Sequence, residues 1–585
     1  MIHSRSIQKL AAIALVSLLA ACGGGGGSGT DGATATGPDG SGAPGGAITP
    51  ASDLPTTKAS ASRFLSQATF GASETEITRL NQTGFSGWVA EQMAAPATTP
   101  HQDYVALQTA QLLKDQSPSA NWIYESFWRQ AVSGSEQLRH RTAFALSQIF
   151  VISLADSGVA ANPRGVAGYM DMLGRNAFGN FRKLLEDVSL HPMMGIYLSH
   201  MKNQKADPVV GRVPDENYAR EVMQLFSIGL YELNQDGTVK LDSRNEPIET
   251  YTIADITGLA RVFTGFSWAG PDKSDARFFG GVPDSDRDIE PMQGYPKFHE
   301  TGPKTFLGTT VSDTTPEASL KAALDRLFMH PNVGPFIGKQ LIQRMVTSNP
   351  SPQYVARVAG AFADNGQGVR GDMKAVIRAV LLDPEARDDT VVGKATGGKV
   401  REPVLRVTSW LRAFDAKSTT GRFLVSETDD PVNNIGQTPM RSPTVFNYFR
   451  PGYVPPNTTI AAANLVAPEM QTTHESSVAG WTNRMRDAVP NGWGNNPQGA
   501  NRRDVQPDYT AAIALADKPD QLVDHVSTLM MAGQMPATLR AQIINAVTSV
   551  AISTTNATAA ETARKNRVYL AVYLTMASPE FIVQK

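Results

Sequence analysis

Hydrophobic residues recur at helical spacing along most of this chain. Behind an S-x-x-E pattern at Ser133 and Glu136, apolar or small residues return every three or four positions from 138 to 152. That pattern predicts a capping box, in which each side chain binds a free backbone N–H group at the start of a helix. The same periodicity predicts helices over residues 215–229, 252–263, 317–328, 333–346, 354–362, 373–382 and 404–414, and a closing bundle over 522–531, 539–549 and 560–577.

Signals for β-strands are few. Asp236-Gly237 lies between short apolar runs and predicts a hairpin turn, and residues 304–307 read as a short strand. Residues 268–302 are rich in Gly, Pro and Asp, and a loop of that length in a compact domain is often functional. We therefore expect a mainly α fold: one large multi-helical domain with a C-terminal helical subdomain and few short strands.

The N-terminal segment has the pattern of an export signal. Basic residues precede an apolar run from Leu10 to Ala21, which is too short to span a bilayer. The run ends in Leu19-Ala20-Ala21-Cys22, which resembles the lipobox of bacterial lipoproteins, where the acylated cysteine becomes the first mature residue. Gly23, where some lipoproteins carry Asp, resembles the outer-membrane sorting pattern. A plain secretory signal with a chance cysteine is the alternative.

The chain divides into three stretches. Residues 1–21 are the expected signal peptide, and residues 22–58 carry the lipidated Cys22 and a Gly/Ser-rich tether that has too little apolar surface to fold. Residues 59–585 form a single domain, with the helical subdomain at about 500–585. We expect the protein to be exported and held in the cell envelope, at the outer membrane, by acyl chains on Cys22.

Composition excludes several kinds of chemistry. Cys22 is the only cysteine, so the folded part has no disulfide, thiolate zinc site, iron–sulfur cluster or cysteine nucleophile. The formal net charge is −2 and no basic stripe is present, which argues against nucleic acid as a partner.

Several segments together resemble one family. The most specific is DENYAREVMQLFSIGL, which begins at Asp215. Others are LRHRTAFALSQIFVIS from Leu138, HETGPKTFLG from His299, HPNVGPFIGKQL from His330 and REPVLR from Arg401. The chain resembles, from about residue 59 to its end, the bacterial domain-of-unknown-function-1800 family. The resemblance implies an exported bacterial protein, often encoded beside a second exported family with a sulfatase-like fold, which is the expected protein partner. It implies no particular reaction.

The helix that begins near Asp215 is the first candidate for chemistry. Glu216 and Arg220 are four residues apart with the acid first, the favourable order for an ion pair, whereas Asn217 and Glu221 share another flank. One interpretation is a solvated helix face with Asp215 as its N-cap. The other is the wall of a cleft, in which Asn217 and Glu221 are polar ligands or an acid/base pair.

His299, Glu300 and Lys304 are the second candidate, because a histidine near a carboxylate can transfer protons at neutral pH. The sequence HETGP is not a zincin motif, since Gly302 and Pro303 would break the helix that such a motif needs. The alternative is a turn before a short strand. The predicted catalytic residues are Glu216, Asn217, Glu221 and His299, and the predicted substrate-binding residues are Arg141, Arg220, Lys304 and Arg401.

Three alternating carboxylates raise the question of a metal. Asp284, Asp286 and Asp288 form a D-x-D-x-D run, and alternate carboxylates in a loop can converge on calcium. Ile289 and Tyr295 stand where an EF-hand needs Gly and Glu, so the run is not an EF-hand. An irregular calcium loop and a solvated acidic loop are the two interpretations.

Two functions follow from these observations. The first is a cell-envelope enzyme that acts on a polymeric or exported substrate, with its site formed by the Asp215 helix, His299 and an arginine. The second is a non-catalytic lipoprotein that binds or assembles an exported partner. An enzyme should gather the candidates around one pocket, whereas a scaffold should scatter them and expose an apolar patch.

Overall fold

The computed structural model describes residues 53–394 and 396–585, in a single compact unit. The expected signal peptide, Cys22 and nearly all of the tether lie outside the described residues. No described helix is long and apolar enough to cross a membrane.

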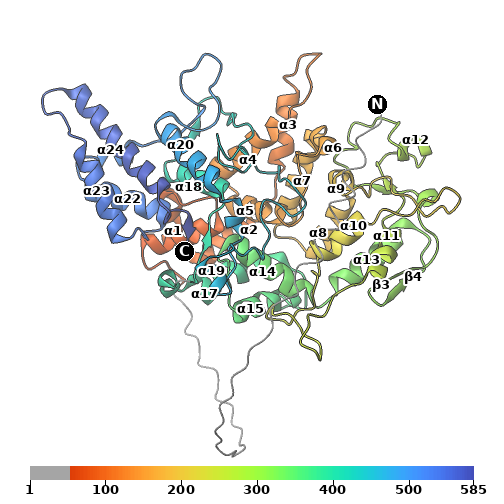
Figure 1. Ribbon diagram of the computed structural model, residues 1–585. Coiled ribbons are helices and arrows are strands. Elements are labelled where there is room, and N and C mark those ends of the chain that lie inside the picture. Colours follow the sequence, from red (N-terminus) through yellow and green to blue (C-terminus); the bar gives the residue numbers. More distant parts are fainter. Residues whose placement is uncertain (1–52, 395) are drawn as a thin grey trace, which may run out of the picture. The chain divides into compact units, whose positions relative to one another are not determined.

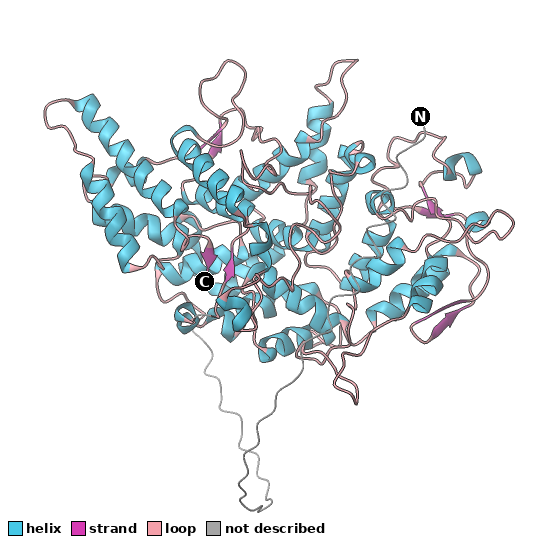
Figure 2. Ribbon diagram, viewed as in Figure 1, coloured by secondary structure: helices cyan, strands magenta, loops and turns pink. Residues whose placement is uncertain are grey.

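Helices dominate the described residues, as Figures 1 and 2 show, so the predicted mainly α fold class is confirmed. The α-helices are α1 (Lys58–Ala68), α2 (Glu74–Ala94), α3 (Pro100–Thr109), α4 (Asn121–Ser133), α5 (Gln137–Ser147), α6 (Ser157–Ala160), α7 (Pro163–Asn176), α8 (Phe181–Leu190), α9 (Pro192–Tyr197), α10 (Asn217–Gln224), α11 (Ile253–Val262), α12 (Asp275–Phe278), α13 (Pro316–Phe328), α14 (Val333–Met345), α15 (Pro352–Ala363), α16 (Met373–Leu382), α17 (Pro384–Arg387), α18 (Pro403–Ala413), α19 (Thr459–Ala462), α20 (Glu475–Asn491), α21 (Thr510–Ala514), α22 (Pro519–Met531), α23 (Ala537–Ser549) and α24 (Ala557–Ala577). Three 3-10 helices are η1 (Pro296–Phe298), η2 (Asp389–Gly393) and η3 (Pro468–Thr472).

The strands of the described residues are short and occur in antiparallel pairs. They are β1 (Phe266–Ser267) with β2 (Gln293–Gly294), β3 (Lys304–Phe306) with β4 (Thr309–Val311), β5 (Lys399–Val400) with β8 (Val583–Gln584), and β6 (Lys417–Ser418) with β7 (Val505–Gln506). The predicted strand at 304–307 is therefore present as β3. An isolated bridge between Leu233 and Val239 closes the predicted turn at Asp236-Gly237.

Capping explains where several helices begin. Thr252 caps α11 in a capping box with Asp255, and the Asp372 side chain accepts the Lys374 N–H at the start of α16. The capping box predicted at Ser133 and Glu136 is wrong. Ser133 is the last residue of α4, and its hydroxyl donates to the Arg129 carbonyl.

The helix predicted to reach residue 152 ends at Ser147 in α5. Ile149 and Ile152 are nonetheless buried, in a non-helical segment after that end. The apolar spacing indicates which residues are buried, and the buried segment continues beyond the end of α5.

The core joins elements that are distant in the sequence. α1 packs against α22, and the closing helices α22, α23 and α24 pack against one another and, through α24, against α20. In Figure 1 these blue helices lie well apart from α10 and α11. Gly258 lets α11 approach β3, because a Cβ atom there would lie 1.7 Å from the Thr305 carbonyl oxygen.

Candidate functional site

Glu221 is the predicted catalytic residue with the least ordinary environment. It lies on α10, its side chain is buried, and its Oε2 atom has no hydrogen-bond partner among the described residues. Burial raises the pKa of this carboxyl to about 7, and the neighbouring charge of Arg220 only partly offsets that effect. Glu221 therefore changes its charge near neutral pH, where a general acid or base is most effective.

Glu221 lies on one flank of α10, between the exposed Asn217 and the half-buried Gln224. Asn217, one turn before it, is exposed and donates to the Ser199 hydroxyl over 3.5 Å. Gln224, almost one turn after it, is half-buried and accepts from the Tyr251 hydroxyl over 3.4 Å. The negative charge of Glu221 also acts on Tyr197, because it contributes to the raised pKa of that phenol.

Glu216 and Arg220 lie toward solvent. Asp215 caps the start of α10 as predicted, because its carboxylate accepts the Asn217 N–H over 2.8 Å. Glu216, which directly precedes α10, makes no capping hydrogen bond, and its carboxylate accepts from Thr257 of α11 over 2.8 Å. Its ion pair with Arg220 is loose, at 3.9 Å, with 38% and 44% of the two side chains exposed. A pair of this kind contributes about 0.5 kcal/mol or less to stability.

His299 is fully buried and both ring nitrogens already have partners. Nδ1 lies 2.8 Å from the Thr264 carbonyl oxygen, and Nε2 lies 3.0 Å from the Ser319 hydroxyl. Burial lowers the pKa of the imidazole, so it is neutral at pH 7. The His299 ring connects the loop before β3 to α13, so its role in this structure is to stabilise the fold.

Glu216 contacts the middle of α11, and His299 contacts a residue just after its end. Thr257 lies midway along α11, whereas Thr264 follows its last residue, so the two contacts are about 10 Å apart along the axis. The two side chains therefore contact neighbouring parts of the chain and do not meet at one point. Glu216, Asn217, Glu221 and His299 do not line the two adjoining cavities beside Phe144 or the cavity beside Arg401.

Lys304 and Arg141 bind backbone carbonyls in the interior. The Lys304 ammonium donates to the Asp313 carbonyl over 2.7 Å, and burial lowers its pKa. Arg141 is fully buried and donates to the Arg344 carbonyl over 2.6 Å. Both contacts are internal to the fold, so neither cation is displayed to a substrate at the surface.

Arg141 belongs to a buried charge cluster that the sequence analysis missed. Its members are Arg141, Arg344, Lys399, Glu402, Arg406 and Glu469. Lys399 forms the one ion pair among them, at 2.8 Å to Glu469, with each side chain 1% exposed. Glu402 accepts instead from the Gln148 and Gln437 amides, each over 2.5 Å. Burial lowers the pKa of each arginine to about 10.

The three aspartates of the predicted calcium loop are bound by arginines. Asp286 and Asp288 both pair with Arg164, at 2.9 Å from its Nη1 and 3.1 Å from its Nε respectively. Asp284 pairs with the buried Arg277. Among the described residues, no group of three or more His, Cys, Asp or Glu side chains is arranged to hold a metal ion.

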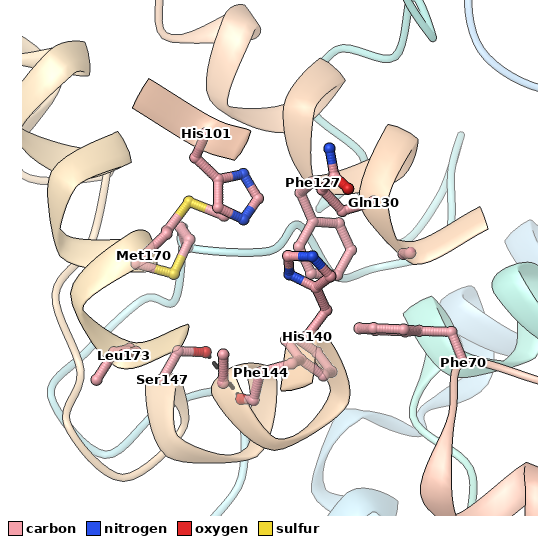
Figure 3. Close-up of a pocket in the computed structure, with 12 residues that line it drawn as sticks. Phe70, His101, Phe127, Gln130, His140, Phe144, Ser147, Met170 and Leu173 are labelled. Carbon is pink, nitrogen blue, oxygen red and sulfur yellow. Dashed lines mark hydrogen bonds between the residues drawn. The ribbon is translucent and has the colours of Figure 1, made fainter. Parts of the chain in front are cut away.

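Figure 3 shows an aromatic cavity that contains a histidine pair. The His101 and His140 rings lie 5.7 Å apart, edge to face, and Met170, Phe127 and Ser147 also line the space. His101 accepts or donates a hydrogen bond over 2.7 Å with Ser126, and burial lowers the pKa of His140 to about 4. The cavity volume is about 20 Å³, which is room for about one water molecule. Two neutral imidazoles there can hydrogen-bond a small polar group but cannot supply positive charge.

A second cavity adjoins the first and shares Phe144, Ser147 and Met440 with it. Gln148 and Gln437 line it, and these are the two amides that hold Glu402. The only sequence signal for this region is that His140, Ser147 and Gln148 belong to the run LRHRTAFALSQIFVIS.

The comparisons with known proteins agree with the motifs. The model of a family described as "Protein of unknown function (DUF1800)" matches residues 63–583, nearly the whole chain. No curated protein and no solved structure matches. The matched stretch begins within α1 and ends in β8, and thus contains every candidate residue of the folded part. The chain therefore belongs to the DUF1800 family of proteins of unknown function.

Proposed function

We propose that this protein is a lipid-anchored enzyme of the cell envelope that acts on a polymeric or exported substrate, with Glu221 as its proton-transferring group. The observation that carries the proposal is the buried Glu221 carboxyl, which has an unpartnered oxygen and a pKa raised to about 7. Perturbed carboxyl groups of this kind are concentrated at functional sites.

The surroundings of Glu221 suit proton transfer. A structural ion pair would explain a buried carboxylate, but Glu221 forms none with the described residues. The exposed Asn217 and Arg220 are on the same helix, one turn and one residue before it, and can position a polar substrate. In this proposal Asn217 binds the substrate and Glu221 is the acid/base group. Glu216 is a surface residue without a catalytic role, and His299 stabilises the fold.

The test compares Glu221→Gln with a matched control, Glu216→Gln, at the residue that directly precedes the same helix. Purified wild-type protein is incubated with peptidoglycan sacculi and with extracted envelope polysaccharide, and soluble products are measured by mass spectrometry. We expect release by the wild type and the control, and release at least about a hundredfold slower by Glu221→Gln. Equal rates for Glu221→Gln and wild type would exclude the assigned role, and no release from either polymer by wild type would reject this substrate class.

A second candidate function is supported by a different observation. Between Asp207 and Arg212 a short hairpin presents Val209 and Val210 to solvent, with 92% and 69% of these residues exposed. Val213, just beyond it, is 78% exposed. Apolar side chains exposed on a hairpin turn suit an adaptor that binds an exported partner, for which the sulfatase-like family is the expected class.

This alternative predicts the behaviour of a double variant. Val209→Asp with Val210→Asp should abolish co-purification of a sulfatase-like partner, because it places two charges in an apolar contact. Val478→Asp is the control, since Val478 is also exposed, at 55%, but lies on α20. Co-purification that survives in the double variant would show that the hairpin is not the contact.

A further inference from the structure

The widest of the three cavities lies beside Arg401, far along the chain from Glu221. Its walls come from α1, from the end of α22 and the turn after it, and from β8. Its volume is about 330 Å³, which is at the lower end of the range of small-molecule sites. Met531, Ala532 and Val583 give it apolar walls, and Ser66 and Gln534 add polar groups.

Arg401 brings a buried charge to this cavity. The residue is 4% exposed, its Nη1 donates to the Met530 carbonyl over 2.8 Å, and its guanidinium lies 5.1 Å from the centre of the Phe581 ring. It forms no ion pair with any described residue, and burial, together with the charge of Arg406, lowers its pKa to about 10. Nε and Nη2 make no hydrogen bond with the described residues. These two atoms form the edge of an arginine that best matches a carboxylate.

The other charged groups of the cavity are already engaged or peripheral. Arg63 donates to the Ala386 carbonyl over 3.0 Å and pairs with Asp389 at 3.3 Å. The Lys585 ammonium binds two backbone carbonyls, each over 3.2 Å. Glu580 is exposed, and its negative charge disfavours a ligand with two negative charges. One free guanidinium edge therefore remains beside an apolar wall.

We infer that this cavity binds a small organic monocarboxylate with an apolar body, whose carboxylate pairs with Nε and Nη2 of Arg401. The apolar body lies against Met531 and Val583. One guanidinium edge can bind a carboxylate or a phosphate, and the negative charge of Glu580 at the cavity favours the singly charged carboxylate. The site is separate from Glu221 and does not depend on the proposed reaction.

Hexanoate and benzoate are the probes, with 1-hexanol as the neutral counterpart and inorganic phosphate as the alternative anion. Isothermal calorimetry on the full folded protein should show saturable binding of a carboxylate and no binding of 1-hexanol or phosphate. Arg401→Met should weaken carboxylate binding at least a hundredfold and Arg401→Lys at least tenfold. Arg486→Gln, an exposed arginine on α20 with the same loss of charge, should bind as wild type does.

Three results would overturn the inference: no saturable carboxylate binding by wild type, equal binding by Arg401→Lys, or tighter binding of phosphate. Ser66→Phe provides a variant that leaves Arg401 intact, because Ser66 lines the cavity from α1. If Arg401→Met fails to fold, loss of binding in Ser66→Phe supports the site and retained binding contradicts it.

Discussion

At the scale of single residues, hydrogen-bond partners separate candidates that look equal in the sequence. His299 has partners at both ring nitrogens, in Thr264 and Ser319, so its buried ring is fully used by the fold. Glu221 is also buried but has an oxygen without a partner among the described residues. The sequence placed both in the same category, because the partners of His299 are 35 and 20 residues away in the chain. Only the folded structure shows which of the two is free to act.

The free carboxyl has a consequence for stability that can be measured. The pKa of Glu221 is raised in the folded state from an ordinary 4.5 to about 7, so the folded state binds this proton more tightly than the unfolded state. The ionised form then destabilises the fold by about 3 kcal/mol above pH 7, and the effect vanishes below about pH 4.5. Glu221→Gln should be more stable than wild type by up to that amount at pH 8, and the difference should disappear as the pH falls to about 4.5.

Urea denaturation of both proteins across this pH range gives the measurement. Glu216→Gln is the control, because its carboxylate is partly exposed. A Glu221→Gln variant that is strongly destabilised at pH 8 would mean that Glu221 compensates a buried positive charge, and it would remove the residue from the proposed mechanism.

At the scale of elements, the helices were largely predictable and their irregular neighbours were not. Residues 373–382 were predicted as a helix and form α16 over the same span, and 404–414 corresponds to α18 within one residue at each end. The segment after Ser147 was predicted as helix because Ile149 and Ile152 continue the apolar spacing. Sequence spacing cannot distinguish a buried turn from another helical turn when both face the core.

The buried arginines were unpredictable for a related reason. Arginine is normally a surface residue, and nothing local marks Arg141 or Arg344 as interior. Their positions are determined by contacts between α5, α14 and the segment after β5, which are distant in the sequence. Arg141 and Arg401 were nevertheless singled out as ligand-binding residues, and the structure separates them: Arg141 lies in the charge cluster, and Arg401 lines a cavity.

The Lys399–Glu469 ion pair of the charge cluster predicts a large loss of stability when one partner is removed. Lys399→Met removes the only ion-pair partner of Glu469 within the cluster and leaves its carboxylate with the more distant charges of the buried arginines, which should lower the free energy of unfolding by up to about 3–5 kcal/mol. Adding Glu469→Gln should recover much of this loss, because the second change removes the stranded charge. Chemical denaturation of the two variants gives the comparison. Additive losses would contradict direct coupling between the two side chains.

At the scale of the whole molecule, anchoring is the feature to be tested. Cys22 lies outside the described residues, and the proposal of a lipid anchor rests on the sequence that precedes it. Wild-type protein should partition into the detergent phase of a two-phase extraction, and Cys22→Ala should move to the aqueous phase, because acyl chains supply the membrane affinity. Partition of both proteins into the aqueous phase would show that the protein has no lipid anchor, and that part of the proposed function would be wrong.

The packing of α1 against α22 has a consequence for the way this protein is made. Helix α1, at the start of the folded part, packs against α22, which is near the C-terminal end. Strand β5 likewise pairs with β8, so it remains unpaired until the end of the chain has been made. A ribosome or an export channel delivers the chain from the N-terminus, so α1 emerges long before its partner exists. The domain can therefore complete its core only when nearly all of the chain has been delivered. During the proposed export, this delayed closure keeps the polypeptide open enough to pass through a channel, and it exposes α1 to chaperones and proteases until the last helices arrive.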